Sequence, residues 1–172
     1  TPTYWQKSQF PSWVSEAIEV IHEGVDVAAL SNLQNNQVKF PFFEIDSGME
    51  ILTYVSRCFE EYRGFPQAIQ AISILQQKRP NLHVVLVGQD GEAYGSGRSD
   101  GLGWSQWAIS NLKLDPARTH WLGSLQEQDY RSVLAVSNVH LYLTVPFVLS
   151  WSLLEAMAAG CSLVCSSTPP VL

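Results

Sequence analysis

The stretch FPQAIQAISILQQKRPNLHVVLVG, residues 65–88, holds a helical pattern followed directly by a strand pattern. Ile69, Ile72 and Leu75 recur at helical spacing, and one proline suits the first turn while another follows the last. The run LHVVLVG, residues 82–88, is almost entirely apolar and ends in glycine, which is typical of a parallel strand buried on both faces. A helix that leads directly into such a strand is the repeating unit of an α/β fold.

The same alternation continues on both sides of this unit. We predict, in chain order, strand 49–57, helix 65–80, strand 82–88, helix 104–114, strand 119–124, helix 125–138, strand 139–145, helix 152–160 and strand 161–166. This order predicts a parallel sheet with helices on both faces. Such sheets bind ligands at the carboxyl ends of their strands, so we expect a site in segments 56–64, 88–103, 123–128 and 145–151.

Composition narrows the class of protein. The chain has 172 residues, of which 46% are hydrophobic and 15% charged, with a formal net charge of −6. This balance indicates a globular domain and argues against a broad basic face for nucleic acid. Cys161 and Cys165 lie in an apolar run and are expected to be buried free thiols. We expect no metal site and no membrane span, and the start at Thr1 suggests a piece of a longer protein.

Two arginines follow the first predicted strand. Arg57 ends that strand, and Arg63 with Gly64 precedes a helix N-terminus, where free N–H groups favour anions. Two guanidinium groups there could hold a diphosphate through bidentate hydrogen bonds, and Gly64 would let it approach the backbone. The alternative is that both arginines pair with Glu60 and Glu61 in a surface loop. The residues alone leave both interpretations open.

Two loops after other strands carry weaker signals. The glycine-rich segment 87–103 could bind phosphate through its backbone, or it could be a loop without a ligand. Ser124 and Glu127 have the spacing of a capping box, which favours a structural role. The backbone near Ser124 and Leu125 could still face a ligand.

Glu155 is the one charged residue in the stretch TVPFVLSWSLLEAMAAG, residues 144–160. Ser152 lies three residues before it, so a capping box is one interpretation. A carboxylate in the first turn of a helix after a strand could instead accept hydrogen bonds from the hydroxyls of a ribose. The four histidines are scattered, and we expect packing or hydrogen-bonding roles for them at positions 22, 83, 120 and 140.

Two longer stretches, SRCFEEYRGFPQAIQAISILQQKRP (56–80) and LTVPFVLSWSLLEAMAAGCSLVCSSTPPV (143–171), together resemble the family 4 (group 1) glycosyltransferases. The resemblance covers residues 50–172. It implies a GT-B fold, in which two Rossmann-like domains face each other and the C-terminal one binds a nucleotide-sugar donor. Residues 1–45 would then be the tail of the N-terminal domain and the linker, with VIHEGVD (20–26) in the linker. Residues 46–172 would be the Rossmann-like donor-binding domain, truncated at its C-terminal end.

The resemblance also implies residue roles. The family's strand-end Gly-Arg and later Lys-Gly are similar to Ser56-Arg57 and Arg63-Gly64, so the two arginines inherit binding of the donor diphosphate. Glu155 matches the helix acidic residue that binds the ribose. The implied catalytic residues are Arg57 and Arg63, and the implied donor-binding residues are Gly64, Gly88, Ser124, Leu125, Phe147, Val148, Leu149, Ser150 and Glu155.

One position departs from the family pattern. A second glutamate usually precedes the helix acidic residue by eight positions, and here Phe147 stands in its place. The usual carboxylate contact to the donor sugar is therefore absent, although backbone N–H groups of 148–151 could still meet the sugar or phosphate. This change indicates either a different sugar preference or a domain that has lost its activity.

The resemblance implies a retaining glycosyltransferase that moves a sugar from a nucleoside-diphosphate sugar to a glycan, lipid or small-molecule acceptor. The acceptor would bind through the missing N-terminal domain, and neither a cofactor nor a metal is expected. We expect a cytoplasmic location, with peripheral membrane association only through the missing part. This chain alone is expected to bind nucleotide weakly and to transfer no sugar. The alternatives are a non-catalytic nucleotide-binding or scaffold domain of the same fold, and a phosphorylase-like or epimerase-like enzyme.

Overall fold

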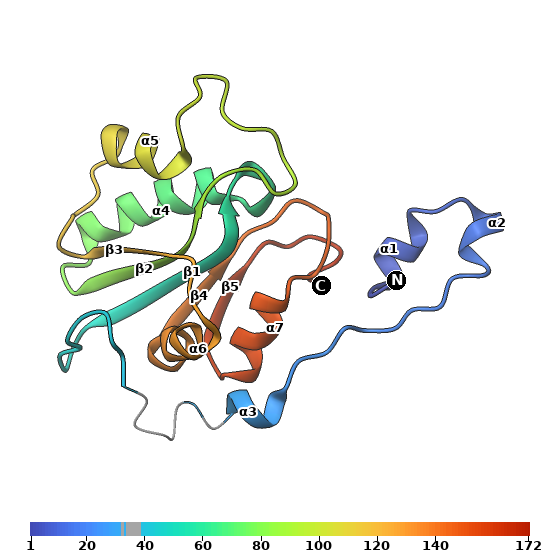
Figure 1. Ribbon diagram of the computed structural model, residues 1–172, viewed down its shortest axis with the longest axis horizontal. Coiled ribbons are helices and arrows are strands. Elements are labelled where there is room, and N and C mark those ends of the chain that lie inside the picture. The colour runs from blue at the N-terminus through green and yellow to red at the C-terminus, as the bar shows by residue number, and fades with distance from the viewer. Residues whose placement is uncertain (32, 34–38) are drawn as a thin grey trace.

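The computed structural model describes residues 1–31, 33 and 39–172. Its core is a five-stranded parallel sheet with the order β3-β2-β1-β4-β5 (Figure 1). The strands are β1 (Glu50–Phe59), β2 (Leu82–Asp90), β3 (Thr119–Gly123), β4 (Val139–Tyr142) and β5 (Ser162–Cys165). Within the sheet, the chain passes first through the central strand β1, then through β2 to β3 on one side, and then crosses to β4 on the other side of β1. The carboxyl ends of β1 and β4 therefore form the switch point at which such sheets bind ligands.

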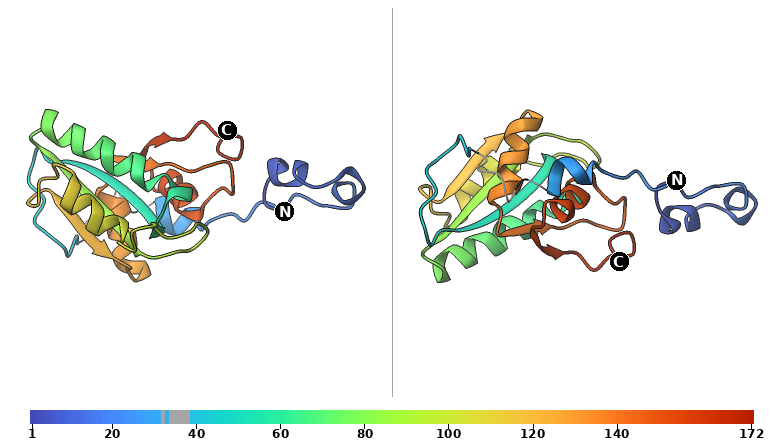
Figure 2. Two further views of the ribbon diagram at one scale, coloured as in Figure 1. Left: turned by 90° about the horizontal axis from the view of Figure 1, so that it is seen from above. Right: turned by 90° about the horizontal axis from the view of Figure 1, so that it is seen from below.

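Helices cover both faces of the sheet, as the two views of Figure 2 show. On one face α4 (Phe65–Lys78) and α5 (Trp104–Asn111) pack on the sheet, and Phe65, Ile69 and Ile72 of α4 are completely buried. On the other face lie α6 (Glu127–Val136) and α7 (Trp151–Ala158). The predicted α/β class, a Rossmann-like parallel sheet with helices on both faces, is confirmed.

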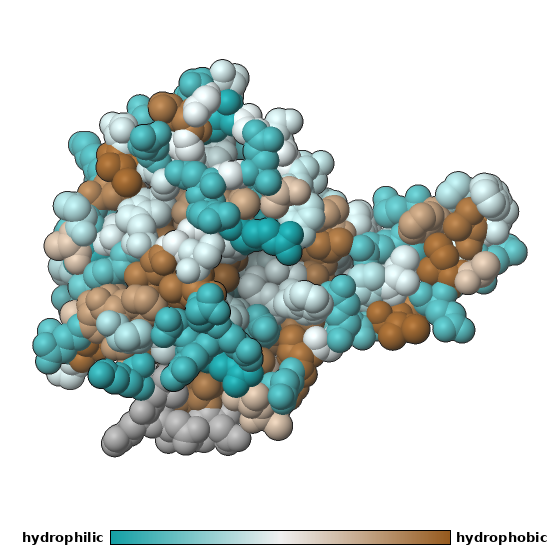
Figure 3. Space-filling view, viewed as in Figure 1, coloured by the Kyte–Doolittle hydropathy of each residue, from teal (hydrophilic) through white to brown (hydrophobic). Residues whose placement is uncertain are grey.

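The N-terminal segment lies outside the sheet. It holds α1 (Tyr4–Ser8), α2 (Ser12–Ser15) and α3 (Val27–Ser31), and its first part projects from the body as an arm (Figures 1 and 3). Of these three helices, α3 makes the most extensive contact with the body, where Leu30 joins the cluster under α7. The predicted connection over 20–26 carries no helix or strand. The division at residues 45 and 46 stays a prediction.

All nine predicted strands and helices are present, with shifted ends. β1 continues to Phe59, two residues beyond its predicted end, because its last residues pair with the extended end of β2. β4 ends at Tyr142 instead of 145, since the chain there turns away into the loop before α7. α6 begins two residues late, at Glu127, with Gln126 as its N-cap.

That late start makes the predicted capping box of Ser124 and Glu127 wrong. Ser124 lies two residues outside the N-cap, and its hydroxyl faces Oε1 of Gln89 at 3.4 Å. Glu127 pairs instead with Arg131 one turn along the helix. Of the two thiols expected to be buried, Cys161 is buried and Cys165 is half-buried on β5, which pairs with β4 at the edge of the described sheet.

Candidate functional site

A cavity of about 490 Å³ opens at the carboxyl ends of β1 and β4. Its walls come from the end of β1, the short 3-10 helix η1 (Glu61–Arg63), the loop after β4 and the start of α7. Pro2, Gln6 and Glu23 of the N-terminal segment also line it. It brings together six of the predicted site residues, namely Arg57, Arg63, Phe147, Val148, Leu149 and Ser150.

Arg63 is held firmly in the wall of this cavity. Its side chain is largely buried, and its Nη1 donates a hydrogen bond to the hydroxyl oxygen of Tyr142 over 3.1 Å. Its backbone oxygen accepts a hydrogen bond from the hydroxyl of Tyr54 at 2.7 Å. The guanidinium carbon also lies 5.2 Å from the ring centroid of Tyr94 and 5.8 Å from that of Phe147. A cation fixed in this way is preorganised for an anion.

Arg57 lies exposed at the end of β1, and its guanidinium has no hydrogen bond among the described residues. The interpretation in which Arg57 and Arg63 pair with Glu60 and Glu61 is wrong. In the described part of the chain, neither arginine has a carboxylate oxygen within ion-pair distance. Glu60 does not pair with either arginine because its carboxylate is buried and accepts hydrogen bonds from backbone N–H groups of another loop. Both positive charges therefore remain available to a ligand.

Tyr142, the last residue of β4, connects the arginine to the loop before α7. Its hydroxyl oxygen accepts from Arg63 and from the backbone N–H of Ser150 at 3.2 Å, and it donates to the carbonyl oxygen of Val148 at 3.3 Å. Burial raises the pKa of this tyrosine, so the hydroxyl keeps its proton. The sequence analysis missed Tyr142, because one tyrosine in a strand carries no signal of its own.

Glu155 lies on α7 in a neighbouring pocket of about 230 Å³, together with Gly24, Val25 and Asp26 of the linker. Its Oε2 accepts a hydrogen bond from the hydroxyl of Tyr130 at 2.8 Å. Burial and the adjacent Glu155 carboxylate raise the pKa of Tyr130. Trp151 lines both this pocket and the larger cavity, so the two adjoin.

The capping interpretation of Glu155 is wrong. The N-cap of α7 is Ser150, whose side-chain oxygen accepts from the backbone N–H of Ser152. Ser152 is thus already the second residue of the helix, and Glu155 lies beyond the turn whose N–H groups need a cap. The carboxylate that was to act as a cap faces Tyr130 and the pocket instead.

Besides Glu155, four predicted donor residues lie outside the lining of the cavity, namely Gly64, Gly88, Ser124 and Leu125. The backbone of Gly64 has φ of +60°, and a Cβ there would come within 2.5 Å of the Leu143 Cβ. A Cβ at Gly88 would lie 2.4 Å from the carbonyl oxygen of Ser56. Packing therefore requires both glycines, whatever ligand they meet. Ser124 is exposed and Leu125 half-buried. The donor contacts of these four residues stay predictions.

The histidines have packing and hydrogen-bonding roles wherever the structure buries them. His140 is fully buried in β4, and its Nδ1 lies 2.9 Å from the Thr53 hydroxyl. His83 and His120 lie on neighbouring strands with their ring nitrogens 3.1 Å apart. Within the described ranges, no three histidine, cysteine, aspartate or glutamate side chains form a group that could hold a metal ion.

Fold and cavity together define a Rossmann-like α/β domain with two arginines at its switch point that have no carboxylate partner among the described residues. The family model described as "Glycosyl transferases group 1" matches residues 35–172, and that described as "Glycosyl transferase family 4 group" matches residues 1–30. The chain therefore belongs to the group 1 glycosyl transferases. No curated protein gives a significant match. Along the described residues, no helix combines the length and the apolar character needed to cross a membrane.

Several solved structures share the fold. A protein from Anabaena, Alr3699/HepE, solved with UDP and glucose, matches with a TM-score of 0.63 and 22% identity over 91% of this chain and 40% of its own. Sucrose-phosphate synthase from Thermosynechococcus elongatus matches with a TM-score of 0.63 and 21% identity, over 98% of this chain and 40% of its own. The C-terminal domain of LpcC from Francisella tularensis matches with a TM-score of 0.63 and 17% identity, over 87% of this chain and 75% of its own. This chain thus spans 40% of the length of the first two proteins.

Proposed function

We propose that this chain is the donor-binding domain of a retaining glycosyltransferase, which transfers a sugar from a nucleoside-diphosphate sugar to a glycan, lipid or small-molecule acceptor. The observation that carries the proposal is the cavity at the ends of β1 and β4, where Arg57 and Arg63 have no carboxylate partner among the described residues. An acidic protein that keeps two unpaired cations in one cavity is suited to a small, highly charged anion.

The proposed chemistry is electrostatic. As the bond between sugar and diphosphate breaks, negative charge grows on the leaving nucleoside diphosphate, and the two guanidinium groups stabilise it. Arg63 is the better preorganised of the two, because Tyr142 and two aromatic rings already fix its orientation. On this proposal neither a metal nor a cofactor takes part.

Glu155 is proposed to hold the ribose. Its Oε2 is occupied by Tyr130, which leaves the rest of the carboxylate to accept from hydroxyl groups in the adjoining pocket. A nucleotide that spans both pockets would pass Trp151, which lines each of them. A donor held at both ends has its reacting bond fixed in place, which is how positioning lowers a barrier. The family match and a neighbour solved with UDP and glucose support a nucleotide-sugar ligand.

The test is calorimetric titration of the chain with UDP, GDP and ADP. The proposal expects one of them to bind, weakly and without added metal, and the corresponding nucleoside to bind far less. Retention is read separately, from the anomeric configuration of the product by NMR in a form of the protein that turns over. The cytoplasmic location, the missing N-terminal domain and the acceptor stay predictions.

Phe147 favours one alternative, a nucleotide-binding or scaffold domain without transfer activity, because the family's usual glutamate is absent there. The same titration, extended to the nucleotide sugars, separates the two possibilities. Binding of the nucleotide with no additional contribution from the attached sugar would favour the scaffold. A nucleotide sugar that binds differently from the bare diphosphate would favour the transferase.

A further inference from the structure

Glu60 is a buried carboxylate with an uncommon set of partners. It is 3% exposed, and no cation in the described ranges pairs with it. Its Oε2 accepts from three successive backbone N–H groups, those of Ala93 (3.3 Å), Tyr94 (3.0 Å) and Gly95 (3.1 Å). Buried carboxylates are costly unless hydrogen bonds satisfy them, and successive N–H groups form an anion-binding concavity. This side chain therefore occupies an anion site made by the protein's own loop.

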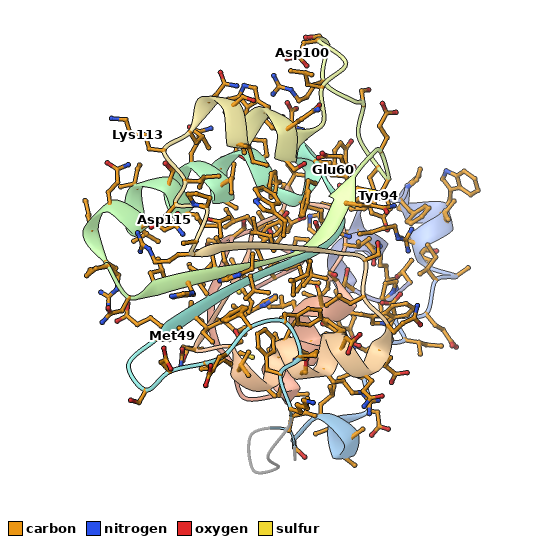
Figure 4. All side chains as sticks on the ribbon, turned by 60° about the vertical axis from the view of Figure 1, so that its left-hand side comes forward. Met49, Glu60, Tyr94, Asp100, Lys113 and Asp115 are labelled. Carbon is orange, nitrogen blue, oxygen red and sulfur yellow. The ribbon has the colours of Figure 1, made fainter. Side chains whose placement is uncertain are left out.

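The hydrogen bonds to Glu60 fix the position of Tyr94, whose own N–H is one of the three donors. The glycine-rich segment that follows β2 is tied to the start of η1, and Tyr94 lines the same cavity as Arg57 and Arg63. Figure 4 shows Glu60 and Tyr94 side by side at one end of the sheet, whereas Asp100 lies at the far tip of that loop. A Cβ on Gly95 would approach the Tyr62 ring to 3.2 Å, so the loop fits closely here.

Tyr94 and Phe147 then form one aromatic surface beside the buried arginine. Their ring centroids lie 4.9 Å apart at an interplanar angle of 62°, and Phe147 also meets the Tyr62 ring edge-on at 5.7 Å. The Arg63 guanidinium lies over both Tyr94 and Phe147. Phe147 is the residue that replaces the family's expected glutamate, and the structure places it among aromatic rings.

We propose that Glu60 is a positioning residue that holds residues 93–95 so that Tyr94 and Phe147 form an aromatic subsite for the donor sugar, next to the diphosphate at Arg63. This inference rests on the proposed function of the cavity. The subsite would contact the C–H face of the sugar, because both rings offer an apolar surface. A carboxylate at position 147 would instead have accepted hydrogen bonds from the sugar hydroxyls.

The proposal has a consequence for the class of donor. A site built to pair with a hydroxyl rejects a sugar that lacks it, because a buried polar group is left without a partner. An aromatic surface has no such partner to lose. The protein should therefore bind donors that carry a deoxy sugar nearly as well as donors that carry the parent sugar, within about tenfold in affinity, where a site that pairs with the hydroxyl would discriminate more strongly.

The first test concerns Glu60 alone and needs no ligand. Amide hydrogen exchange is measured for wild type, Glu60→Gln and the control Glu92→Gln, whose carboxylate accepts from the Gly97 N–H at 2.8 Å in the same loop. We expect Glu60→Gln to speed exchange at residues 93–95 by about tenfold or more, while the control affects residue 97 only. Unchanged exchange at 93–95 in Glu60→Gln would overturn the positioning role.

The second test measures the contribution of the sugar. Calorimetry compares the nucleoside diphosphate that binds with its glucose and 4-deoxyglucose conjugates, in wild type, Tyr94→Ala and Glu60→Gln. We expect both variants to lose several-fold in affinity for the bare diphosphate, because the Tyr94 ring also helps to orient Arg63, and to lose about tenfold more toward both conjugates. Equal losses for diphosphate and conjugates, or strong rejection of the deoxy conjugate by wild type, would overturn the aromatic subsite. Absence of any diphosphate binding would overturn the proposed function itself.

Discussion

Arg63 donates a hydrogen bond from Nη1 to the hydroxyl oxygen of Tyr142 over 3.1 Å, across the switch point between β1 and β4. The same hydroxyl oxygen accepts from the N–H of Ser150, and its O–H donates to the carbonyl oxygen of Val148. One phenol thus sets the orientation of the buried cation and the course of the loop that leads into α7.

Tyr142→Phe removes this hydroxyl and keeps the ring. We expect nucleoside-diphosphate affinity to fall by about tenfold and the free energy of unfolding to fall by about 1–3 kcal/mol, since Arg63 and Ser150 lose a buried acceptor. Calorimetry and urea denaturation measure the two effects. Tyr4→Phe is the control, because Tyr4 is 80% exposed on α1. A variant that binds like wild type would show that Arg63 needs no support from Tyr142.

Glu155 allows a test of ribose binding. Glu155→Gln should weaken binding of the ribonucleoside diphosphate by about tenfold, because a charged acceptor contributes more than a neutral one. For the 2′-deoxy nucleotide the same substitution should reduce affinity much less, since this nucleotide lacks one of the hydroxyls from which the carboxylate would accept a hydrogen bond. Equal losses for the two nucleotides would mean that the carboxylate acts through Tyr130 and the packing of α7, and not on the ribose.

Gly64 and Gly101 separate packing from backbone strain. Both have positive φ, +60° and +72°, but only at Gly64 would a Cβ meet another atom, the Leu143 Cβ at 2.5 Å. We expect Gly101→Ala to cost about 1 kcal/mol from strain alone and Gly64→Ala about 2–4 kcal/mol from strain and overpacking. Denaturant titration gives both values. Equal costs would contradict the close contact between residue 64 and the loop after β4.

His140 makes stability depend on pH. Burial lowers the pKa of this histidine from 6.5 to about 4. Between these values the unfolded chain takes up a proton that the folded protein excludes, so stability falls as pH drops from 6.5 toward 4. The full effect is about 3 kcal/mol for one side chain.

The check is urea denaturation of wild type and His140→Leu between pH 7 and pH 4. The variant loses the contact with Thr53 at every pH, which gives a constant offset. Carboxylates and the other histidines titrate alike in both proteins, so the difference between the two curves isolates His140. The free energy of unfolding of wild type minus that of the variant should fall by up to about 3 kcal/mol from pH 7 to pH 4. A difference that stays constant would show that folding leaves the pKa of His140 unchanged.

Much of the fold could be predicted because its signals are local. The apolar run of β2 and the spacing of Ile69 and Ile72 in α4 each lie within one segment, and the structure has both elements where expected. The start of α6 was missed because Ser124 and Glu127 imitate a capping box, whereas Gln126 begins the helix without a side-chain cap. Local pattern alone cannot choose between two nearby starts of a helix.

The site could be predicted only in part, for the same reason. Arg57, Arg63 and residues 147–150 were expected at strand ends, and strand ends of a parallel sheet meet at one edge. The contacts that orient them join distant parts of the chain. Arg63 and Tyr142 are 79 residues apart, and Glu60 and Tyr94 are 34 apart. A single sequence carries no sign of such pairs, so Tyr142, Tyr94 and the role of Glu60 emerged only from the structure.

The central claim is that Arg57 and Arg63 bind the diphosphate of the donor. Calorimetry with the nucleoside diphosphate and with the bare nucleoside, on wild type, Arg57→Gln, Arg63→Gln and the control Arg79→Gln, tests it most directly. Arg79 is exposed and paired with Glu50. We expect each of the first two variants to lose about tenfold or more in affinity for the diphosphate and nothing for the nucleoside, while the control matches wild type. Diphosphate affinity that is unchanged in both arginine variants would contradict the account.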